Sequence, residues 1–390
     1  MRKLTALCFA FLLAGCAVTE EEKTEYEKVE FTAVVTSDLH YTASPSAFNS
    51  IVPLEPLAPE ITDAMIEQVI AMKPDAFIMT GDNTNNGKPE DVKELAQKLG
   101  RVKDAGIEVI MTTGNHDYGQ STAGMKAYEE YFLPLLSMSE KDPESFSYKT
   151  VNNGVTVLAM DDSHPEDSAG YFSEETMAWL KKQLDEAEKA KSRVLFLSHH
   201  NIVCGQVSEM YSGYLVGNEG LYEMLADHDV RICMSGHQHN QAVWHKDDMY
   251  EVLSGMPLQA GTFGIFTMNE EGFSYHTEPV DLKKYGEEGL YEQAAELTER
   301  QSSSFMSAFE KLCAEKNLTE EDTDKVISLV RRFFSASEQG TLAQEAEDIL
   351  HHGDYELMQS VLWDKNYGPW IQELLKNPPA DGSSLSFEWQ

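Results

Sequence analysis

From Phe31 to about Leu282 the sequence alternates short apolar runs with longer amphipathic stretches, and this alternation restricts the fold more than any other feature. The apolar runs have the length of buried strands, and the stretches between them have helical periodicity. Helices are expected over 59–72, 89–104 and 173–190. The runs expected to form strands are FTAVVTS, DAFIMT, EVIMTT, VTVLAM, RVLFLS, VRICMS, YEVLSG, GIFTM and FSYHTEPV. The alternation predicts an α/β fold.

After about Tyr285 the pattern becomes helical throughout. The segments TEED at 319 and TLAQ at 341 are typical of capping boxes that begin helices. We therefore divide this part of the chain into an α/β domain over 31–284 and a helical C-terminal domain over 285–390. The helical domain either packs as a cap on the α/β domain or acts as a lid or a partner-docking surface.

The chain begins MRKLTALCFAFLLAGC, with two positive residues followed by an apolar stretch too short to span a bilayer. The LAGC ending resembles the cleavage signal of bacterial lipoproteins, in which Cys16 receives a lipid. We expect a signal peptide over 1–15, an acidic tether over 16–30 and a lipid-anchored membrane protein that faces outside the cytoplasm. The alternative is an ordinary signal peptide with an incidental cysteine.

Composition limits the partners and the redox chemistry. The formal net charge of −36 repels nucleic-acid polymers, so none is expected to bind. A small phosphate ester is still compatible with this charge, because metal ions can dominate the potential of a pocket. Cys204, Cys233 and Cys313 show no paired spacing, so they form either one disulfide or three buried thiols. The oligomeric state is left open.

Polar clusters stand where the apolar runs end. They are Asp38 and His40, then Asp82, then Asn115, His116 and Asp117, then His199 and His200, and last His237 and His239. Because ligands of open α/β sheets bind beyond the carboxyl ends of the strands, we expect these clusters to meet. Residues i and i+2 at a strand end can face the same side, so Asp38 should converge with His40, and His237 with His239.

The residue types in these clusters suit two divalent transition-metal ions. Imidazole and carboxylate ligands together favour Mn²⁺ or Fe, with Zn²⁺ as an alternative. Asp82 can bridge two ions, and Asn115 offers a neutral carbonyl oxygen. Each cluster alone is weak evidence, because Gly, Asn and Asp are ordinary turn residues and a single His is more often structural. Five clusters in succession, each after a strand, predict a two-metal site that activates water and polarises a phosphoryl group.

The ordered motifs D-x-H, G-D, G-N-H-D, H and G-H-x-H resemble the calcineurin-like metallophosphoesterase superfamily over about residues 31–245. The resemblance implies a four-layer α/β/β/α sandwich of two mixed sheets, followed here by a helical subdomain. It implies one metal site of Asp38, His40, Asp82 and His239, and a second of Asp82, Asn115, His199 and His237.

The same resemblance implies catalytic roles for two residues of the GNHD motif. His116 would reach the phosphate and assist the leaving oxygen. Asp117 would hydrogen-bond His116 and set its tautomer, unless it only caps the following turn. His200 and His164 either contact substrate or are structural, and Tyr211 and Tyr214 either stack on a base or anchor their loop.

The segment GDNTNNG and the short helical tail look most similar to the class III cyclic nucleotide phosphodiesterase branch. The expected activity is hydrolysis of phosphodiesters, with cyclic nucleotides among the candidate substrates. A hydroxide that bridges the two ions would attack phosphorus, and a small phosphate ester would be the partner. The alternatives are a phosphomonoesterase or nucleotidase acting outside the cell, and a surface lipoprotein that binds a ligand without catalysis.

Overall fold

The computed structural model describes residues 26–45, 52, 54–119, 122–165, 168–204, 216–363 and 367–389. The expected signal peptide, Cys16 and most of the expected tether lie outside these residues, as do Tyr211 and Tyr214. The lipid anchor and the domain boundaries stay predictions.

Six strands form the first sheet, in the order β13-β12-β11-β1-β2-β3. β1, β2 and β3 run parallel, whereas β11, β12 and β13 are joined to β1 by antiparallel pairs. The strands are β1 (Glu30–Thr36), β2 (Ala76–Thr80), β3 (Glu108–Thr112), β11 (Thr262–Asn269), β12 (Gly272–Pro279) and β13 (Ser384–Glu388). Every residue of β2 is buried, because helices cover one face of this sheet and the second sheet covers the other.

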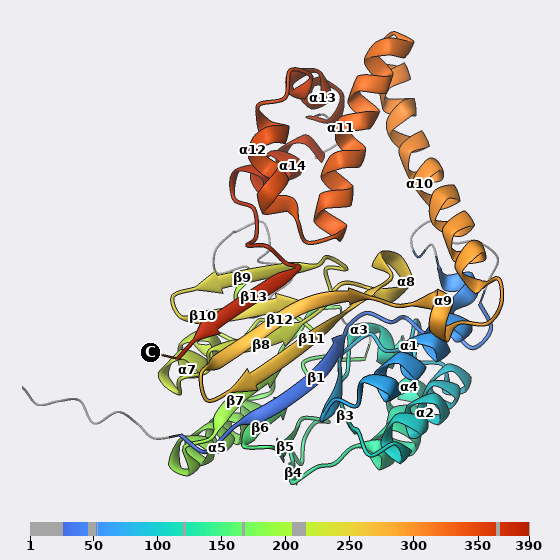
Figure 1. Ribbon diagram of the computed structural model, residues 1–390. Helices are drawn as coiled ribbons and strands as arrows, with labels where there is room; N and C mark the ends of the chain where they lie inside the picture. The colour runs from blue at the N-terminus through green and yellow to red at the C-terminus, as the bar shows by residue number, and fades with distance from the viewer. Residues whose placement is uncertain are drawn as a thin grey trace, which may run out of the picture.

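Seven strands form the second sheet, in the order β4-β5-β6-β7-β8-β10-β9. β6, β7, β8 and β10 are parallel, and β4, β5 and β9 add antiparallel edges. The strands are β4 (Glu140–Lys141), β5 (Tyr148–Asn152), β6 (Val155–Ala159), β7 (Arg193–Leu197), β8 (Ile232–Ser235), β9 (Ala242–Lys246) and β10 (Met249–Leu253). The expected sandwich of two mixed sheets is confirmed (Figure 1).

Long helices cover the outer faces of the sandwich. α1 (Ala58–Met72) and α2 (Pro89–Asp104) flank the first sheet, and α5 (Glu174–Ala190) and α7 (Leu221–Asp227) flank the second (Figure 1). α2 has the predicted bounds because Pro89 begins it and acidic residues in its first turn complement the helix dipole. In α5 the Ser173 hydroxyl accepts a hydrogen bond from the Thr176 amide, which fixes where the helix starts.

Short elements connect these layers and were not predicted individually. They are η1 (Glu55–Leu57), α3 (Asn115–Tyr118), α4 (Thr122–Ala127), the π-helical turn η2 (Tyr128–Phe132), η3 (Leu133–Leu135), α8 (Pro257–Ala260) and α9 (Leu282–Tyr285). All the predicted strands form, whereas β4, β5, β9 and the C-terminal β13 were missed. β4 and β9 are the edges of the second sheet and β5 lies next to β4. All three contain exposed or half-exposed residues, so they lack the continuous apolar run of the central strands.

The C-terminal helical region consists of α10 (Leu290–Glu315), α11 (Glu320–Glu338), α12 (Leu342–Leu350), α13 (Tyr355–Leu362) and α14 (Tyr367–Lys376). α10 leads away from the sandwich and α11 returns beside it, with α12, α13 and α14 packed against α11 (Figure 1). At α11 the Thr319 hydroxyl accepts a hydrogen bond from the Asp322 amide, as TEED predicted. α12 begins where TLAQ predicted, but the Thr341 hydroxyl makes no capping bond, so the capping box there was wrong.

The expectation that the chain is helical throughout its last hundred or so residues was wrong at the end. β13 (Ser384–Glu388) returns to the first sheet and pairs antiparallel with β12. Phe387 stacks on Phe273 of β12, with ring centroids 4.8 Å apart. The sequence SLSFE alternates polar and apolar residues with the period of a strand, so the signal was present but short.

Two further expectations concern membrane spans and disulfides. Within the described residues, no helix combines the length and the apolar composition that crossing a bilayer requires. Cys204, Cys233 and Cys313 are all described, and they are buried thiols that form no disulfide with one another. Of the two alternatives for these cysteines, the structure therefore has three buried thiols.

Candidate metal centre

The strands that precede the polar clusters end at the same edge of the sandwich. The first sheet brings Asp38 and His40 after β1, Asp82 after β2 and Asn115 after β3, while the second brings His199 after β7 and His237 and His239 after β8. The structure thus gathers all seven predicted ligands from two sheets at one place. Their roles as metal ligands stay predictions, which the geometry allows us to examine.

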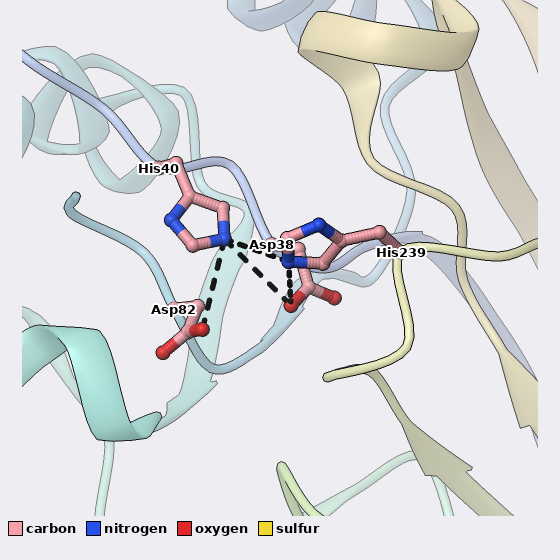
Figure 2. A group of neighbouring side chains, drawn as sticks. All are labelled: Asp38, His40, Asp82 and His239. Carbon is pink, nitrogen blue, oxygen red and sulfur yellow. Dashed lines mark hydrogen bonds and ion pairs between the residues drawn. The ribbon is translucent and has the colours of Figure 1, made fainter. Parts of the chain in front are cut away.

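One group of donor atoms comes from Asp38, His40, Asp82 and His239, and Figure 2 shows the four side chains pointing toward one another. The Nε2 atoms of His40 and His239 lie 3.0 Å apart. The Oδ2 atom of Asp82 lies 3.6 Å from His40 Nε2, and the Oδ1 atom of Asp38 lies 3.5 Å from His239 Nε2. These atoms therefore surround a space of the size of a single ion.

A second group adjoins the first and shares Asp82 with it. Its centre is His199 Nε2, which lies 3.3 Å from Asp82 Oδ2, 3.2 Å from Asn115 Oδ1 and 3.2 Å from His237 Nδ1. The single carboxylate of Asp82 therefore faces imidazoles of both groups. A shared carboxylate is the ligand that can bridge two ions lying about 3.5 to 4 Å apart.

The donor atoms fit divalent transition metals. An octahedral ion with bonds of about 2.1 Å places neighbouring ligand atoms about 3.0 Å apart, which matches the closest nitrogen pair here. His199 Nδ1 lies 3.0 Å from the Thr80 carbonyl oxygen and donates to it, so Nε2 is the ring atom that faces the centre. The Asp82 carboxylate outweighs burial and raises the pKa of His199 to about 10, so a bound cation would take the place of the Nε2 proton.

The electrostatics of these groups also suit a cation. Burial lowers the pKa of His40 to about 3 and that of His237 to about 2, so both rings stay neutral and keep a lone pair to donate. Burial alone would raise the pKa of Asp82, but its ion pair and hydrogen bond with His199 outweigh burial and hold the pKa well below its usual value. Asp82 is therefore ionised and the two rings are neutral, as ligands must be.

The backbone at the site is held in an uncommon conformation. Asp38, His40, Asp82, His237 and His239 all have φ between 46° and 70°, in the left-handed region that non-glycine residues rarely adopt. Each such residue costs on the order of 1 kcal/mol, and such strain gathers at functional sites. The turns also correct the strand-end argument: Asp38 and His40 converge, but His237 and His239 face different groups of donors.

Two glycines make room for the ligands. A Cβ atom on Gly114 would lie 2.2 Å from the Asp82 amide nitrogen and carboxylate, and one on Gly236 would lie 2.3 Å from the Asp38 carboxylate. Such distances are far below van der Waals contact, so any side chain would displace the carboxylate. This close approach explains why the G-N-H-D and G-H-x-H motifs begin with glycine.

His116 lies beside the first group of donors. Its ring meets the His40 ring edge-on with centroids 4.7 Å apart, and its amide donates to Asp82 Oδ1 at 2.8 Å. His116 Nδ1 lies 2.8 Å from the Asn85 carbonyl oxygen and donates to it. Nε2 is therefore the ring atom available to a substrate. The Asn85 contact was missed by the sequence argument, because a backbone carbonyl leaves no residue-type signal.

Asp117 does not make the expected hydrogen bond to His116. Its carboxylate instead accepts from the Gly114 amide at 3.0 Å, the Thr84 amide at 2.8 Å and the Asn83 side chain at 2.8 Å. The short helix α3 begins at this point, and Asp117 reaches back to the amide of Gly114, the residue that precedes the helix. Burial raises the pKa of Asp117 to about 6. Asp117 is thus a positioning residue that caps the turn, which was the alternative interpretation.

His200 and His164 are engaged by the protein itself. His200 is fully buried, with Nδ1 3.0 Å from the Asp162 carboxylate and Nε2 2.9 Å from the Ser168 carbonyl oxygen. His164 stacks on Tyr171, and its Nε2 lies 2.7 Å from the Tyr171 carbonyl oxygen. Neither belongs to the two groups of donors, so the geometry favours structural roles. Asp162 lies shortly after β6, which ends at Ala159, and its position near a strand end was the signal that could have found it.

A buried glutamate shapes the loop that follows His199. Glu251, on β10, accepts hydrogen bonds from the amides of Ile202 and Val203, both at 2.8 Å, and from the Ser235 hydroxyl at 2.8 Å. Its carboxylate is fully buried and is satisfied by these donors. Glu251 thereby ties the loops after β7 and β8 together, and both loops carry candidate ligands.

Two known proteins are similar to this chain in sequence. Glycerophosphodiester phosphodiesterase GpdQ of Enterobacter lignolyticus is 29% identical over 133 residues, which cover 34% of this chain and 44% of that protein. This chain therefore spans less than half the length of that relative. A probable cyclic nucleotide phosphodiesterase of Rhodococcus erythropolis is 26% identical over 248 residues, which cover 63% of this chain and 74% of that protein.

Solved structures support the fold. A dimetal phosphatase from Danio rerio aligns with a TM-score of 0.52 at 14% identity, covering 65% of this chain and 97% of that one. The family model described as calcineurin-like phosphoesterase matches residues 31–241, which include every residue of the two donor groups. This protein belongs to the calcineurin-like phosphoesterases, and its described residues form a site suited to two metal ions.

Proposed function

We propose that the protein hydrolyses small phosphodiesters to a phosphomonoester and an alcohol. The observation that carries the proposal is the pair of donor groups joined by the Asp82 carboxylate, with His116 beside them. The preference for diesters is supported by the relatives, which are named as glycerophosphodiester and cyclic nucleotide phosphodiesterases. Two bound divalent ions would supply Lewis-acid polarisation of the phosphoryl oxygens and an activated water nucleophile.

The chain's own residues would position the substrate and move one proton. The Asp82 carboxylate holds the two donor groups at a fixed separation, and its Oδ1 atom fixes the His116 backbone. With Nδ1–H donated to the Asn85 carbonyl, the protonated ring can give only its Nε2 proton. That proton goes to the alcohol oxygen as its bond to phosphorus breaks. The water oxygen forms the new bond to phosphorus and gives up a proton to solvent, from which the His116 ring is protonated again. The reaction thus balances without a covalent enzyme intermediate.

The test compares matched esters on purified protein that is stripped of metal and reloaded with Mn²⁺, Fe²⁺ or Zn²⁺. We expect bis(4-nitrophenyl) phosphate to be hydrolysed faster than 4-nitrophenyl phosphate, and only with metal. His116→Ala should lower the rate by about 100-fold for a diester with an alkyl alcohol as leaving group. The loss should be smaller for nitrophenolate, because this leaving group needs no proton.

His245→Ala is the matched control, since His245 is an exposed imidazole on β9 outside the two donor groups. Its rates should equal those of the unaltered protein. A preference for the monoester would replace the proposal with a phosphomonoesterase or nucleotidase. Stoichiometric metal without turnover of either ester would instead favour a surface protein that binds a phosphate ester without catalysis.

We also propose that the protein is anchored by a lipid on Cys16 and acts outside the cytoplasm. The support is the LAGC segment, in which a cysteine follows a short apolar stretch. Cys16→Ala should move the protein from the membrane fraction to the soluble or unprocessed fraction, and it should abolish labelling by a radioactive fatty acid. Unchanged labelling of the variant would contradict the anchor.

A further inference from the structure

A cavity of about 420 Å³ lies between the C-terminal helical region and the loop that follows β8. Its walls come from α8, α10, α11 and α14, together with residues 238–240. One wall residue is His239, which also belongs to the first group of metal donors. A substrate held at the metal centre therefore has this cavity beside it, and the volume lies in the range of small-molecule sites.

One wall of the cavity is aromatic. Phe305 of α10, Phe334 of α11 and Trp370 of α14 line it, and all three rings are only partly buried. The Phe305 and Phe334 rings meet edge to face with centroids 4.9 Å apart, and the Phe334 and Trp370 rings lie 5.9 Å apart at 32°. Three helices thus each contribute one ring to a continuous surface, on which a flat ring can stack.

The wall of the cavity that α8 and the end of α11 form is polar rather than aromatic. There the Gln259 side-chain amide donates to the Glu338 carboxylate at 3.1 Å, and both residues line the cavity. The Glu338 carboxylate lines this space and disfavours a second anionic group in it. An amide beside a carboxyl is suited to hydrogen bonds with the polar edge of a ring.

We propose that this cavity binds the alcohol portion of the phosphodiester, and that this portion carries a flat, uncharged aromatic ring with polar atoms at its edge. The inference rests on the proposed phosphodiesterase function and assigns the C-terminal helical region a part in choosing the substrate. The phosphate would lie at the metal centre, next to His239, and the ring would stack on the aromatic wall. An aliphatic alcohol would leave that wall exposed to water, and an anionic group would face Glu338.

The test measures binding rather than turnover. The affinities of phenylphosphonate and methylphosphonate for the full, metal-loaded protein are compared by titration calorimetry, because the two probes share the same head group. Phenylphosphonate should bind at least about tenfold more tightly, and Trp370→Ala should remove about a tenfold preference. The affinity for methylphosphonate should not change.

Two further variants separate a local effect from loss of folding. Ser304→Trp places a bulky ring in the cavity from an exposed position on α10, so it should also abolish the preference without removing any core contact. Trp363→Ala removes an exposed tryptophan of the same helical region that does not line the cavity, and the preference should persist.

The outcomes distinguish the two proposals. Equal affinities of the unaltered protein for the two phosphonates would overturn the cavity inference, as would an unchanged preference in both Trp370→Ala and Ser304→Trp. Normal hydrolysis of diesters in that case would leave the proposed function standing. A clear preference for phenylphosphonate without hydrolysis of any diester would instead overturn the proposed function and retain the cavity as a binding site.

Discussion

At the metal centre, buried polar side chains lie on strained backbone, whereas in the C-terminal helical region apolar side chains lie on regular helices. Five of the candidate ligands have left-handed backbone conformations. Among the described non-glycine residues of the helical region, only Asn317, in the turn between α10 and α11, shares this conformation. The buried core of that region is built instead from residues such as Phe333, Ile349 and Leu362. The metal centre is therefore organised to position charged and polar groups, and the helical region to bury apolar surface. Mutations in the first region should mainly lower activity, and mutations in the second should mainly lower stability.

The largest effect is expected at the residue that both donor groups share. Asp82→Ala removes the carboxylate that both donor groups share, so diester hydrolysis should fall by about 1000-fold or more. Metal bound per chain, measured by elemental analysis, should fall with it.

Asp185→Ala is the control for this variant. Asp185 belongs to another cluster with Glu188 and His228, but Asp185 is partly exposed on α5 and pairs with Lys181. Hydrolysis and metal content should be unaltered. A comparable loss in both variants would mean that the effect is not specific to the metal centre.

A core substitution in the helical region should lower stability and leave the activity of the folded protein intact. Ile349 is fully buried in α12, and Ile349→Ala should lower the free energy of unfolding by about 2 to 5 kcal/mol. Ile349→Val should lower it by only about 0.5 to 1.5 kcal/mol, because one methyl group is lost. Denaturant titration gives both values, and turnover of a small diester should persist below the transition. A loss of turnover in the folded variant would contradict the separation of the two regions.

A single methyl group should damage the metal centre. In Gly114→Ala the added Cβ meets the Asp82 carboxylate at 2.2 Å, so the bridging ligand must shift. A displacement of about 1 Å can reduce a rate by about 100-fold, and we expect a loss of that size in the rate of diester hydrolysis.

The same substitution in a helix should be favourable. Gly100 lies within α2 with no atom near the position of a Cβ, so Gly100→Ala should stabilise the protein by about 0.5 to 1 kcal/mol with unchanged activity. Thermal unfolding and the initial rates of diester hydrolysis, measured on Gly114→Ala and Gly100→Ala, test the two predictions. Equal activities of Gly114→Ala and Gly100→Ala would show that the close approach at Asp82 is not required.

The smallest effect is expected at a helix cap. The Thr319 hydroxyl accepts a bond from the Asp322 amide, so Thr319→Ala should destabilise the protein by about 1 kcal/mol. Thr341 precedes α12 without a capping bond, and Thr341→Ala should have a clearly smaller effect. Chemical denaturation gives the free energy of unfolding of both variants. Equal decreases in this free energy would mean that the hydrogen bond to the Thr319 hydroxyl does not stabilise the protein.

Much of the fold could be predicted from the sequence because its signals are local. α2 has the expected bounds since proline and acidic residues mark its start, and the central strands form since their apolar runs are continuous. β13 was missed because SLSFE is short, and only its pairing with β12, about a hundred positions away in the chain, makes it part of the sheet. The bond from Asp117 to His116 was wrong for a similar reason, since the amides of Asn83 and Thr84 come from another strand end.

The sequence by itself determined which side chains could donate lone pairs, in what order they occur and that each follows a strand. These properties depend on residue types and short-range patterns, so they can be predicted without knowing how the chain packs. Only the tertiary structure decided that His40 and His239, 199 positions apart, lie 3.0 Å from one another. It also decided that three helices place Phe305, Phe334 and Trp370 in the wall of a cavity that His239 also lines. Such contacts depend on how two sheets and a helical region pack, which no local pattern encodes.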